Sequence, residues 1–169
     1  ALKVAEEELG TLKDKKVLII GATGKIGGIV LMNLESLHQA DIYVTTRKNK
    51  LINTKHGKDD FTTIDYEDRY NYLDQMDVVI SATSSPHYTL TYSKMKKQLV
   101  TAKRRVFVDL AVPMDIEAKI SAVDDTCYYN IDDFTRIAKE NNQKKLREAE
   151  AASGILDEYE LQFEQWMVF

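Results

Sequence analysis

The chain has 169 residues, of which 44% are hydrophobic and 30% are charged, a balance typical of a folded globular domain and not of a disordered segment. The formal net charge of −4 excludes the overall positive field that attracts basic proteins to nucleic acid. No run of about eighteen apolar residues is present, the acidic N-terminus is unlike a signal peptide, and the single cysteine, Cys127, cannot form an internal disulfide. We therefore predict a cytoplasmic protein without a membrane span.

Short apolar runs alternate with amphipathic segments along most of the chain. The apolar or β-branched runs predict strands at 17–20, 41–46, 61–65, 77–83, 105–112 and 127–131. Helical periodicity is found between them, at 1–9, 25–37, 67–76 and 93–100. Strands that alternate with helices indicate a parallel sheet covered on both faces. We predict an α/β protein with a Rossmann-type doubly wound parallel sheet and a long C-terminal helix.

The tail differs from the rest of the chain. After position 132 no proline and a single glycine, Gly154, interrupt apolar residues that recur at helical spacing, which predicts one helix of about 35 residues. Its last turns, LQFEQWMVF at 161–169, are too apolar to be stable in water alone, so we expect them to pack against another subunit or a further domain. We place one domain at 1–133 and the long helix at 134–169.

The segment VLIIGATGKIGG at 17–28 runs from a buried strand through a cluster of glycines into a helix. Its glycines have the context of a dinucleotide-binding turn, although their spacing is one residue longer than the commonest Gly-x-Gly-x-x-Gly. Glycines let the backbone approach a pyrophosphate, and the N–H groups and dipole at the start of a helix attract its charge. A tight turn that binds nothing is the alternative. We predict that the cofactor is bound here by Gly21, Thr23, Gly24, Lys25, Ile26 and Gly27.

The end of the second strand indicates which dinucleotide binds. Domains that bind NAD tend to carry an acidic residue there for the ribose 2′-hydroxyl, whereas NADP sites accept or use an arginine. Here the sequence is VTTRKNK, and the only nearby acid, Asp41, lies at the start of the strand. A solvated basic loop is the alternative. We predict NADPH as the cofactor, with contacts at this end from Thr46, Arg47 and Lys48.

Three further segments are specific enough to be compared with a known family: SATSSPH at 81–87, DLAVPMDIE at 109–117 and YYNIDDFTRIAKENNQKKLREAE at 128–150. With the opening ALKVAEEELGTLKDKKVLIIGA, they resemble the nucleotide-binding domain of glutamyl-tRNA reductases over essentially the whole chain. Enzymes of that family have a catalytic N-terminal domain, an NADPH domain and a C-terminal dimerisation domain joined by a long helix. The resemblance implies that this chain is the middle part, with a linker helix at 1–10, and its start at Ala1 agrees with a piece of a longer protein.

The family reduces glutamyl-tRNA to glutamate 1-semialdehyde at the entry to tetrapyrrole synthesis, through a thioester on a cysteine of the N-terminal domain. The resemblance therefore implies that this chain has no catalytic residue, meets glutamyl-tRNA through other domains and forms a homodimer through its long helix. Cys127 lies in an apolar strand pattern, where cysteine is usually an inert small hydrophobe.

The family match also implies contacts beside the nicotinamide. The residues concerned are Thr83, Ser84 and Ser85 in one loop, and Asp109, Ala111, Val112 and Pro113 in another. An ordinary Ser/Thr turn is the alternative for the first group. The chain departs from the family pattern at Met114, where the family usually has arginine, and at Asn130, where it usually has aspartate.

Other assignments remain open. The glycine loop also resembles that of extended short-chain dehydrogenases, whose catalysis uses a Tyr-x-x-x-Lys pair, and Tyr92 and Lys96 have that spacing. A shikimate-dehydrogenase-like NADP oxidoreductase domain shares the fold and the basic end of the second strand. A further alternative is a nucleotide-binding or assembly module without chemistry of its own. The three histidines show no metal-ligand spacing with the carboxylates, so we predict no metal.

Overall fold

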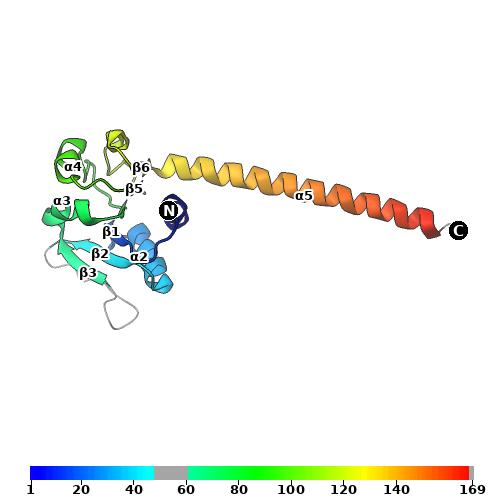
Figure 1. Ribbon diagram of the computed structural model, residues 1–169, viewed down its shortest axis with the longest axis horizontal. Coiled ribbons are helices and arrows are strands. Elements are labelled where there is room, and N and C mark those ends of the chain that lie inside the picture. The colour runs from blue at the N-terminus through cyan, green and yellow to red at the C-terminus, as the bar shows by residue number, and fades with distance from the viewer. Residues whose placement is uncertain (48–60, 168–169) are drawn as a thin grey trace. The chain divides into compact units, whose positions relative to one another are not determined.

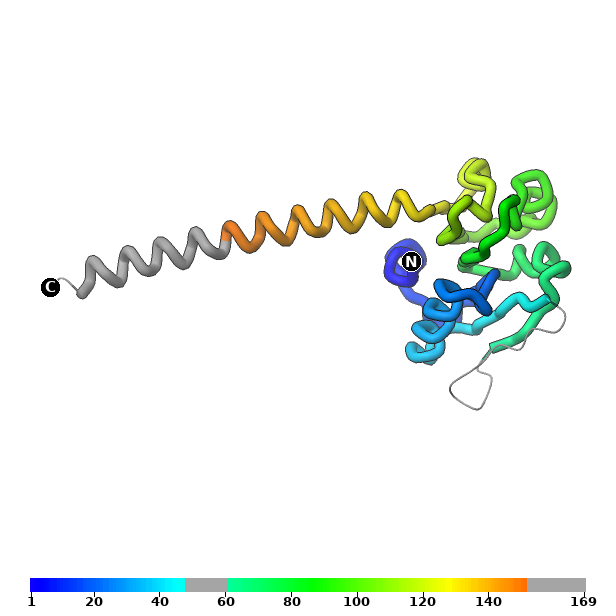
Figure 2. The backbone as a smooth tube through the Cα atoms, turned by 180° about the vertical axis from the view of Figure 1, so that it is seen from behind, coloured from blue at the N-terminus to red at the C-terminus, as the bar shows by residue number. Residues whose placement is uncertain are grey.

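The computed structural model describes residues 1–47 and 61–167. The chain divides into two units, Ala1–Ile131 and Asp132–Phe169. The first unit contains a sheet with helices α1 and α2 on one side and α3 and α4 on the other (Figures 1 and 2). The second unit consists of helix α5.

The sheet has six parallel strands in the order β3-β2-β1-β4-β5-β6. Their bounds are β1 Lys16–Ile20, β2 Asp41–Thr46, β3 Phe61–Asp65, β4 Val78–Ser81, β5 Arg105–Asp109 and β6 Thr126–Tyr129. The order reverses between β1 and β4, where doubly wound sheets form a crevice beyond the carboxyl ends of the strands. The predicted doubly wound parallel sheet is confirmed.

The central strand is apolar because both of its faces are covered. All four residues from Val17 to Ile20 are fully buried, as expected for a parallel strand between two layers of helices. On one face, Leu18 and Ile20 belong to a core cluster with Phe107 of β5 and Met95 of α4. This burial holds the carboxyl end of β1, and therefore the glycine turn that follows it, at the middle of the sheet.

The helices match the predicted positions closely. They are α1 Leu2–Leu9, α2 Lys25–Leu37, α3 Arg69–Tyr72, α4 Tyr92–Gln98 and α5 Ile131–Met167, with 3₁₀ helices η1 Tyr66–Asp68, η2 Leu73–Gln75 and η3 Ala118–Ala122. The 3₁₀ helix η3 was not predicted. The strand predicted at 105–112 ends at Asp109, because the chain turns there into the loop that leads to η3.

Helix α1 is fixed to the β6 edge of the sheet through Glu8. The Glu8 carboxylate accepts hydrogen bonds from the Tyr129 hydroxyl and from the guanidinium of Arg104, and the Cys127 thiol donates to it at 3.4 Å. The Tyr129 bond is the main cause of a lowered pKa at Glu8, and the same bond raises the pKa of Tyr129 to about 12. Burial raises the pKa of Cys127, which keeps this thiol in the protonated form that is not a nucleophile.

Helix α5 has 37 residues and begins at Ile131. Asp132 and Asp133 lie in its first turn, where carboxylates interact favourably with the helix dipole. Ion pairs join Arg136 to Asp133 at 3.1 Å and Lys144 to Glu148 at 4.0 Å along its surface. In the described parts of the chain, no helix combines the length and the apolar character needed to cross a membrane.

Candidate functional site

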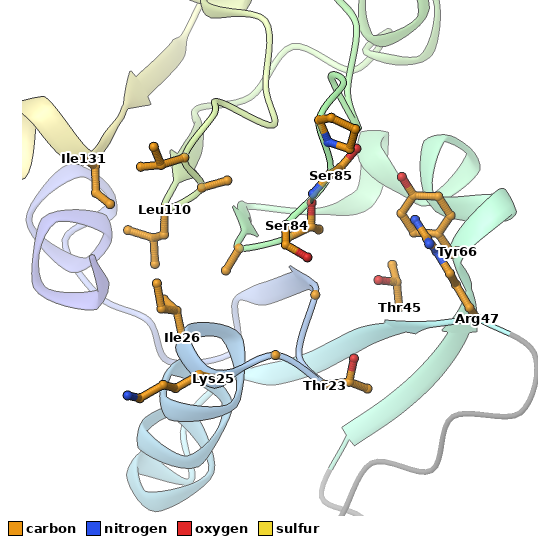
Figure 3. A pocket seen from close by; sticks show the side chains of 17 residues that line it. Thr23, Lys25, Ile26, Thr45, Arg47, Tyr66, Ser84, Ser85, Leu110 and Ile131 are labelled. Atoms are coloured by element: carbon orange, nitrogen blue, oxygen red, sulfur yellow. Dashed lines mark hydrogen bonds between the residues drawn. The ribbon is translucent and has the colours of Figure 1, made fainter.

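A cavity of about 640 Å³ lies beyond the carboxyl ends of the strands, on both sides of the switch between β1 and β4 (Figure 3). It brings together these predicted residues: Gly21, Thr23, Gly24, Lys25, Ile26, Arg47, Thr83, Ser84, Ser85, Ala111 and Val112. Its other lining residues were not predicted: Thr45, Tyr66, Ala82, Pro86, Leu110 and Ile131. The predicted residues Gly27, Thr46, Asp109 and Pro113 do not line it, and Lys48 lies outside the described residues.

Gly21 forms the turn between β1 and α2. Its φ of +90° is a conformation that side chains disfavour, and a Cβ atom there would lie 2.7 Å from the carbonyl oxygen of Ala82. The Gly24 N–H donates to the carbonyl oxygen of Gly21 at 3.0 Å, which closes the turn. Glycine is therefore required at position 21 by both the backbone angle and the close approach of the loop after β4.

Gly27 sets the distance between α2 and this turn. A Cβ atom at Gly27 would lie 2.2 Å from the carbonyl oxygen of Gly21, so only glycine allows the helix to pack this closely. The helix begins at Lys25 and carries no acidic residue in its first turn. The N–H groups at the start of a helix have no partner within the helix, and they attract anions. Gly27 thus sets how closely the start of α2 approaches the glycine turn, without itself lining the cavity.

The β2 end of the cavity contains a cation stacked on an aromatic ring. The guanidinium of Arg47 lies 4.7 Å from the centre of the Tyr66 ring, and both side chains line the cavity (Figure 3). Arg69 lies over the same ring at 4.0 Å, and its Nε donates to the carbonyl oxygen of Thr89 at 2.9 Å. Because Arg69 is anchored, it holds Tyr66 in place under Arg47.

Tyr66 was not among the predicted residues because it follows β3, whereas Arg47 follows β2. The available signal was an aromatic residue directly after the strand that pairs with β2. Thr45 lines the cavity in place of the predicted Thr46, since successive side chains of a strand point to opposite faces.

The described lining of the cavity contains two cations, Lys25 and Arg47, and no carboxylate, although the chain has a formal net charge of −4. Figure 3 shows the Lys25 amino group directed away from the other labelled side chains. Asp65, at the end of β3, does not line the cavity; it accepts a hydrogen bond from the Glu67 N–H at 2.9 Å. The charge of the lining favours an anionic ligand.

The other end of the cavity is formed by the loops after β4 and β5. In the first loop, Thr83, Ser84 and Ser85 line the cavity, and the Ser85 N–H donates to Oγ1 of Thr83 at 3.1 Å. In the second loop, Ala111 and Val112 line it, and the Val112 side chain is well exposed at its rim. The peptide bond between Val112 and Pro113 is cis.

Asp109, at the end of β5, shapes the second loop through hydrogen bonds. It is fully buried, and its carboxylate accepts hydrogen bonds from the N–H groups of Ala111 at 3.0 Å and Ile116 at 2.8 Å. Burial is the main cause of its raised pKa, and the nearby charge of Asp115 raises the pKa further. The structure therefore gives Asp109 contacts with the loop and not with the cavity.

The pair considered for short-chain dehydrogenase chemistry lies elsewhere. Tyr92 and Lys96 are on α4, with the Lys96 amino group 5.9 Å from the centre of the Tyr92 ring, and neither residue lines the cavity. Among the described residues, no group of three or more histidine, cysteine, aspartate or glutamate side chains is placed to hold a metal ion.

A parallel sheet in this order, with a glycine turn at the switch between β1 and β4, defines a Rossmann-type dinucleotide-binding domain. Comparison with known families shows to which family this dinucleotide-binding domain belongs. The chain belongs to the shikimate / quinate 5-dehydrogenase family, whose model matches residues 3–137.

The chain is also similar to glutamyl-tRNA reductases. It is 35% identical over 169 residues to the glutamyl-tRNA reductase of Clostridium novyi (strain NT), a match that covers 99% of this chain and 40% of the relative. It is 41% identical over 160 residues to a probable multifunctional siroheme biosynthesis protein of Ruminiclostridium josui, covering 90% of this chain and 28% of the relative.

Among solved structures, the glutamyl-tRNA reductase from Methanopyrus kandleri superposes with a TM-score of 0.73 at 28% identity, over 87% of this chain and 37% of that one. The predicted resemblance to glutamyl-tRNA reductases is confirmed. The chain spans 28 to 40% of the length of these three proteins.

Proposed function

We propose that this chain is the NADPH-binding domain of an oxidoreductase that reduces glutamyl-tRNA to glutamate 1-semialdehyde in cytoplasmic tetrapyrrole biosynthesis. The observation that carries the choice of cofactor is the cavity lining, in which Arg47 stacks on Tyr66 and no described carboxylate is present. An NAD site would place an acid against the ribose 2′-hydroxyl, and an acid there would repel a 2′-phosphate. The glutamyl-tRNA reductases among the relatives support the substrate.

The cavity suits the three parts of the cofactor in turn. Arg47, stacked on the Tyr66 ring, offers a cation to the 2′-phosphate at the adenosine end. The glycine turn and the start of α2 receive the pyrophosphate. The loops after β4 and β5 remain for the nicotinamide, because β1 separates both of these strands from β2 and the Arg47 end.

Bound NADPH would supply hydride, and the residues of this chain would orient it. The walls formed by Ala111 and Val112 are apolar, so they would keep water from the hydride-donating end. The described part of the chain offers no thiol at the cavity, because Cys127 lies on β6 beside Glu8 and does not line it. We assign the nucleophile and the tRNA contacts to other domains of the whole protein, and we expect this chain alone to be inactive toward glutamyl-tRNA.

The cofactor proposal is tested by calorimetric titration of NADPH and NADH into the purified chain and its Arg47→Ala variant. We expect NADPH to bind at least about tenfold more tightly than NADH, since a charge-assisted hydrogen bond to phosphate contributes about 1.5 to 3 kcal/mol. Arg47→Ala should remove this preference and leave NADH binding nearly unchanged. Arg136→Ala, which removes an exposed arginine of α5, is the control and should keep the preference. Equal affinity of the wild type for both nucleotides would reject NADPH, and absence of any binding would favour an assembly role.

We infer that residues 1–133 form a nucleotide-binding domain and that the helix at 134–169 serves a homodimer, as the resemblance to glutamyl-tRNA reductases implies. Support comes from the sequence LQFEQWMVF at 161–169, which is too apolar to be stable in water alone. By light scattering, a chain truncated after Arg147 should be monomeric. A chain truncated after Met167 should remain a dimer, like the untruncated chain. An unchanged mass after the first truncation would contradict the dimer.

A further inference from the structure

Asp115 is a fully buried carboxylate that neither lines the cavity nor pairs with a lysine or arginine among the described residues. It lies in the loop between β5 and η3, next to Ile116, whose N–H is held by Asp109. A buried carboxylate without a cationic partner depends on hydrogen-bond donors for its stabilisation. The positions of the donors around Asp115 therefore indicate which part of the structure its carboxylate stabilises.

The donors all come from the end of β4 and the loop that follows it. Oδ2 of Asp115 accepts hydrogen bonds from Oγ of Ser81 at 2.7 Å and from the N–H of Thr83 at 2.8 Å. Oδ1 accepts one from Oγ1 of Thr83 at 2.6 Å. The main-chain carbonyl of Asp115 accepts from the N–H groups of Thr89 at 2.7 Å and Leu90 at 3.0 Å. Asp115 thus binds the loop after β4 at both of its ends.

These bonds extend into the cavity wall. With its hydrogen directed at Asp115, the Thr83 hydroxyl presents its oxygen to the Ser85 N–H at 3.1 Å. Thr83 and Ser85 both line the cavity, and so does Ser84 between them, whose side chain Figure 3 shows at the cavity. The Ser85 hydroxyl in turn donates to the carbonyl oxygen of His87 at 2.7 Å. The rotamer of Thr83, and with it the path of the loop, is set by a side chain outside the cavity.

We propose that Asp115 is a positioning residue for the nicotinamide end of the cofactor: it holds the Thr83–Ser85 loop in the shape that receives the nicotinamide half, without touching the cofactor. The inference rests on the proposed function, because it assumes that a dinucleotide occupies this cavity. This role would affect the two halves of the cofactor unequally. Loss of the Asp115 bonds should weaken binding of the nicotinamide half and spare the adenosine half, which binds across β1 at Arg47.

The test compares NADPH with adenosine 2′,5′-bisphosphate, which carries only the adenosine end, in calorimetric titrations of the wild type and Asp115→Asn. An asparagine keeps the shape but cannot accept from all three donors. We expect NADPH to bind about tenfold more weakly to the variant, as for loss of one hydrogen bond to a charged group. Affinity for the bisphosphate should stay within about twofold. Asp115→Ala should show a larger loss of the same kind.

Asp74→Asn is the control, although Asp74, unlike Asp115, also pairs with Arg105 at 2.6 Å. The Asp74 carboxylate also accepts from main-chain N–H groups, those of Val100 and Thr101 at 3.0 Å each, but Asp74 does not line the cavity and binds no residue of the Thr83–Ser85 loop. This variant should lose stability and keep both affinities. If Asp115→Asn fails to fold, Ser81→Ala removes one donor and carries the same comparison with a smaller shift.

Each outcome decides between the two proposals. Failure of the wild type to bind either ligand would reject the proposed function, and with it the role of Asp115. Binding of both ligands by the wild type, with an equal loss of both in Asp115→Asn, would show a general structural role and overturn the positioning role alone. Unchanged affinities in Asp115→Asn would also overturn it. A double-mutant cycle with Thr83→Val should show strong non-additivity for NADPH, because both changes remove the same bond.

Discussion

Replacement of Gly27 by alanine is expected to lower the free energy of unfolding by about 3 kcal/mol and to weaken NADPH binding about a hundredfold. The added methyl would lie 2.2 Å from the carbonyl oxygen of Gly21 and 2.7 Å from its carbonyl carbon, both of them backbone atoms that cannot rotate away. The helix must therefore move off the turn, which carries its first N–H groups away from the phosphate position. The better helix propensity of alanine, about 1 kcal/mol, is too small to offset this.

The neighbouring residue provides the control. A Cβ atom at Gly28 would lie 3.4 Å from the carbonyl oxygen of Ala22, close to an ordinary contact distance. Gly28→Ala should therefore be neutral or stabilise the protein by up to about 1 kcal/mol through helix propensity, with unchanged NADPH affinity. Urea unfolding followed by circular dichroism, together with calorimetry, measures both quantities. Similar results for Gly27→Ala and Gly28→Ala would contradict the packing argument.

The second large effect is expected at Asp109. Asp109→Ala should lower the free energy of unfolding by about 3 kcal/mol, because the N–H groups of Ala111 and Ile116 lose their acceptor in a buried place, at about 1 to 3 kcal/mol each. Asp109→Asn keeps one acceptor oxygen and should cost less. Asp77→Ala is the comparison: its carboxylate accepts from the N–H of Lys16 at 2.8 Å, at the opposite ends of the strands, and its loss should cost about 1 kcal/mol.

The same residue predicts a pH dependence. Because the folded-state pKa of Asp109 is raised above its ordinary value of 3.8, the folded protein holds the proton more tightly than the unfolded chain. The stabilisation is therefore complete below pH 3.8 and is lost as the pH rises through the folded-state pKa. Relative to Asp109→Asn, the wild type should lose stability across this window in urea unfolding at a series of pH values. A difference that is flat or rises with pH would show that burial of Asp109 does not raise its pKa.

All six predicted strands overlap strands of the structure, although some of their ends differ by up to three residues. The predicted bounds 41–46 and 61–65 coincide with β2 and β3. The strand predicted at 105–112 is too long, because the apolar run continues past Asp109 while the backbone turns. That turn depends on the Asp109 carboxylate binding an N–H seven residues away, a contact that no local pattern reveals. The short helix η3 was not predicted because only one of its residues, Ile120, is buried, so it has no apolar pattern that would indicate a helix.

Some of the residues that form the cavity could also be predicted from the sequence, and others could not. Residues of the glycine turn and of the loops after β4 and β5 could be predicted, because each follows directly from a strand end. Tyr66 could not, since its place under Arg47 depends on β3 pairing beside β2 and on the contact of Arg69 with the same ring. Asp115 stands inside the quoted motif DLAVPMDIE, yet its bonds to Thr83 appear only when the loops after β4 and β5 are brought together.

The position of β1 in the sheet has a consequence for how this domain can change over evolution. Arg47 follows β2 and Ala111 follows β5, with β1 and β4 between them, so the two ends of the cavity share no strand. The glycine turn after β1 lies between these two ends and packs closely against the loop after β4 and against helix α2. Under the proposed function, selection can therefore change the preference for a 2′-phosphate at Arg47 while the loops after β4 and β5 stay unchanged, as long as the turn between them keeps its glycines.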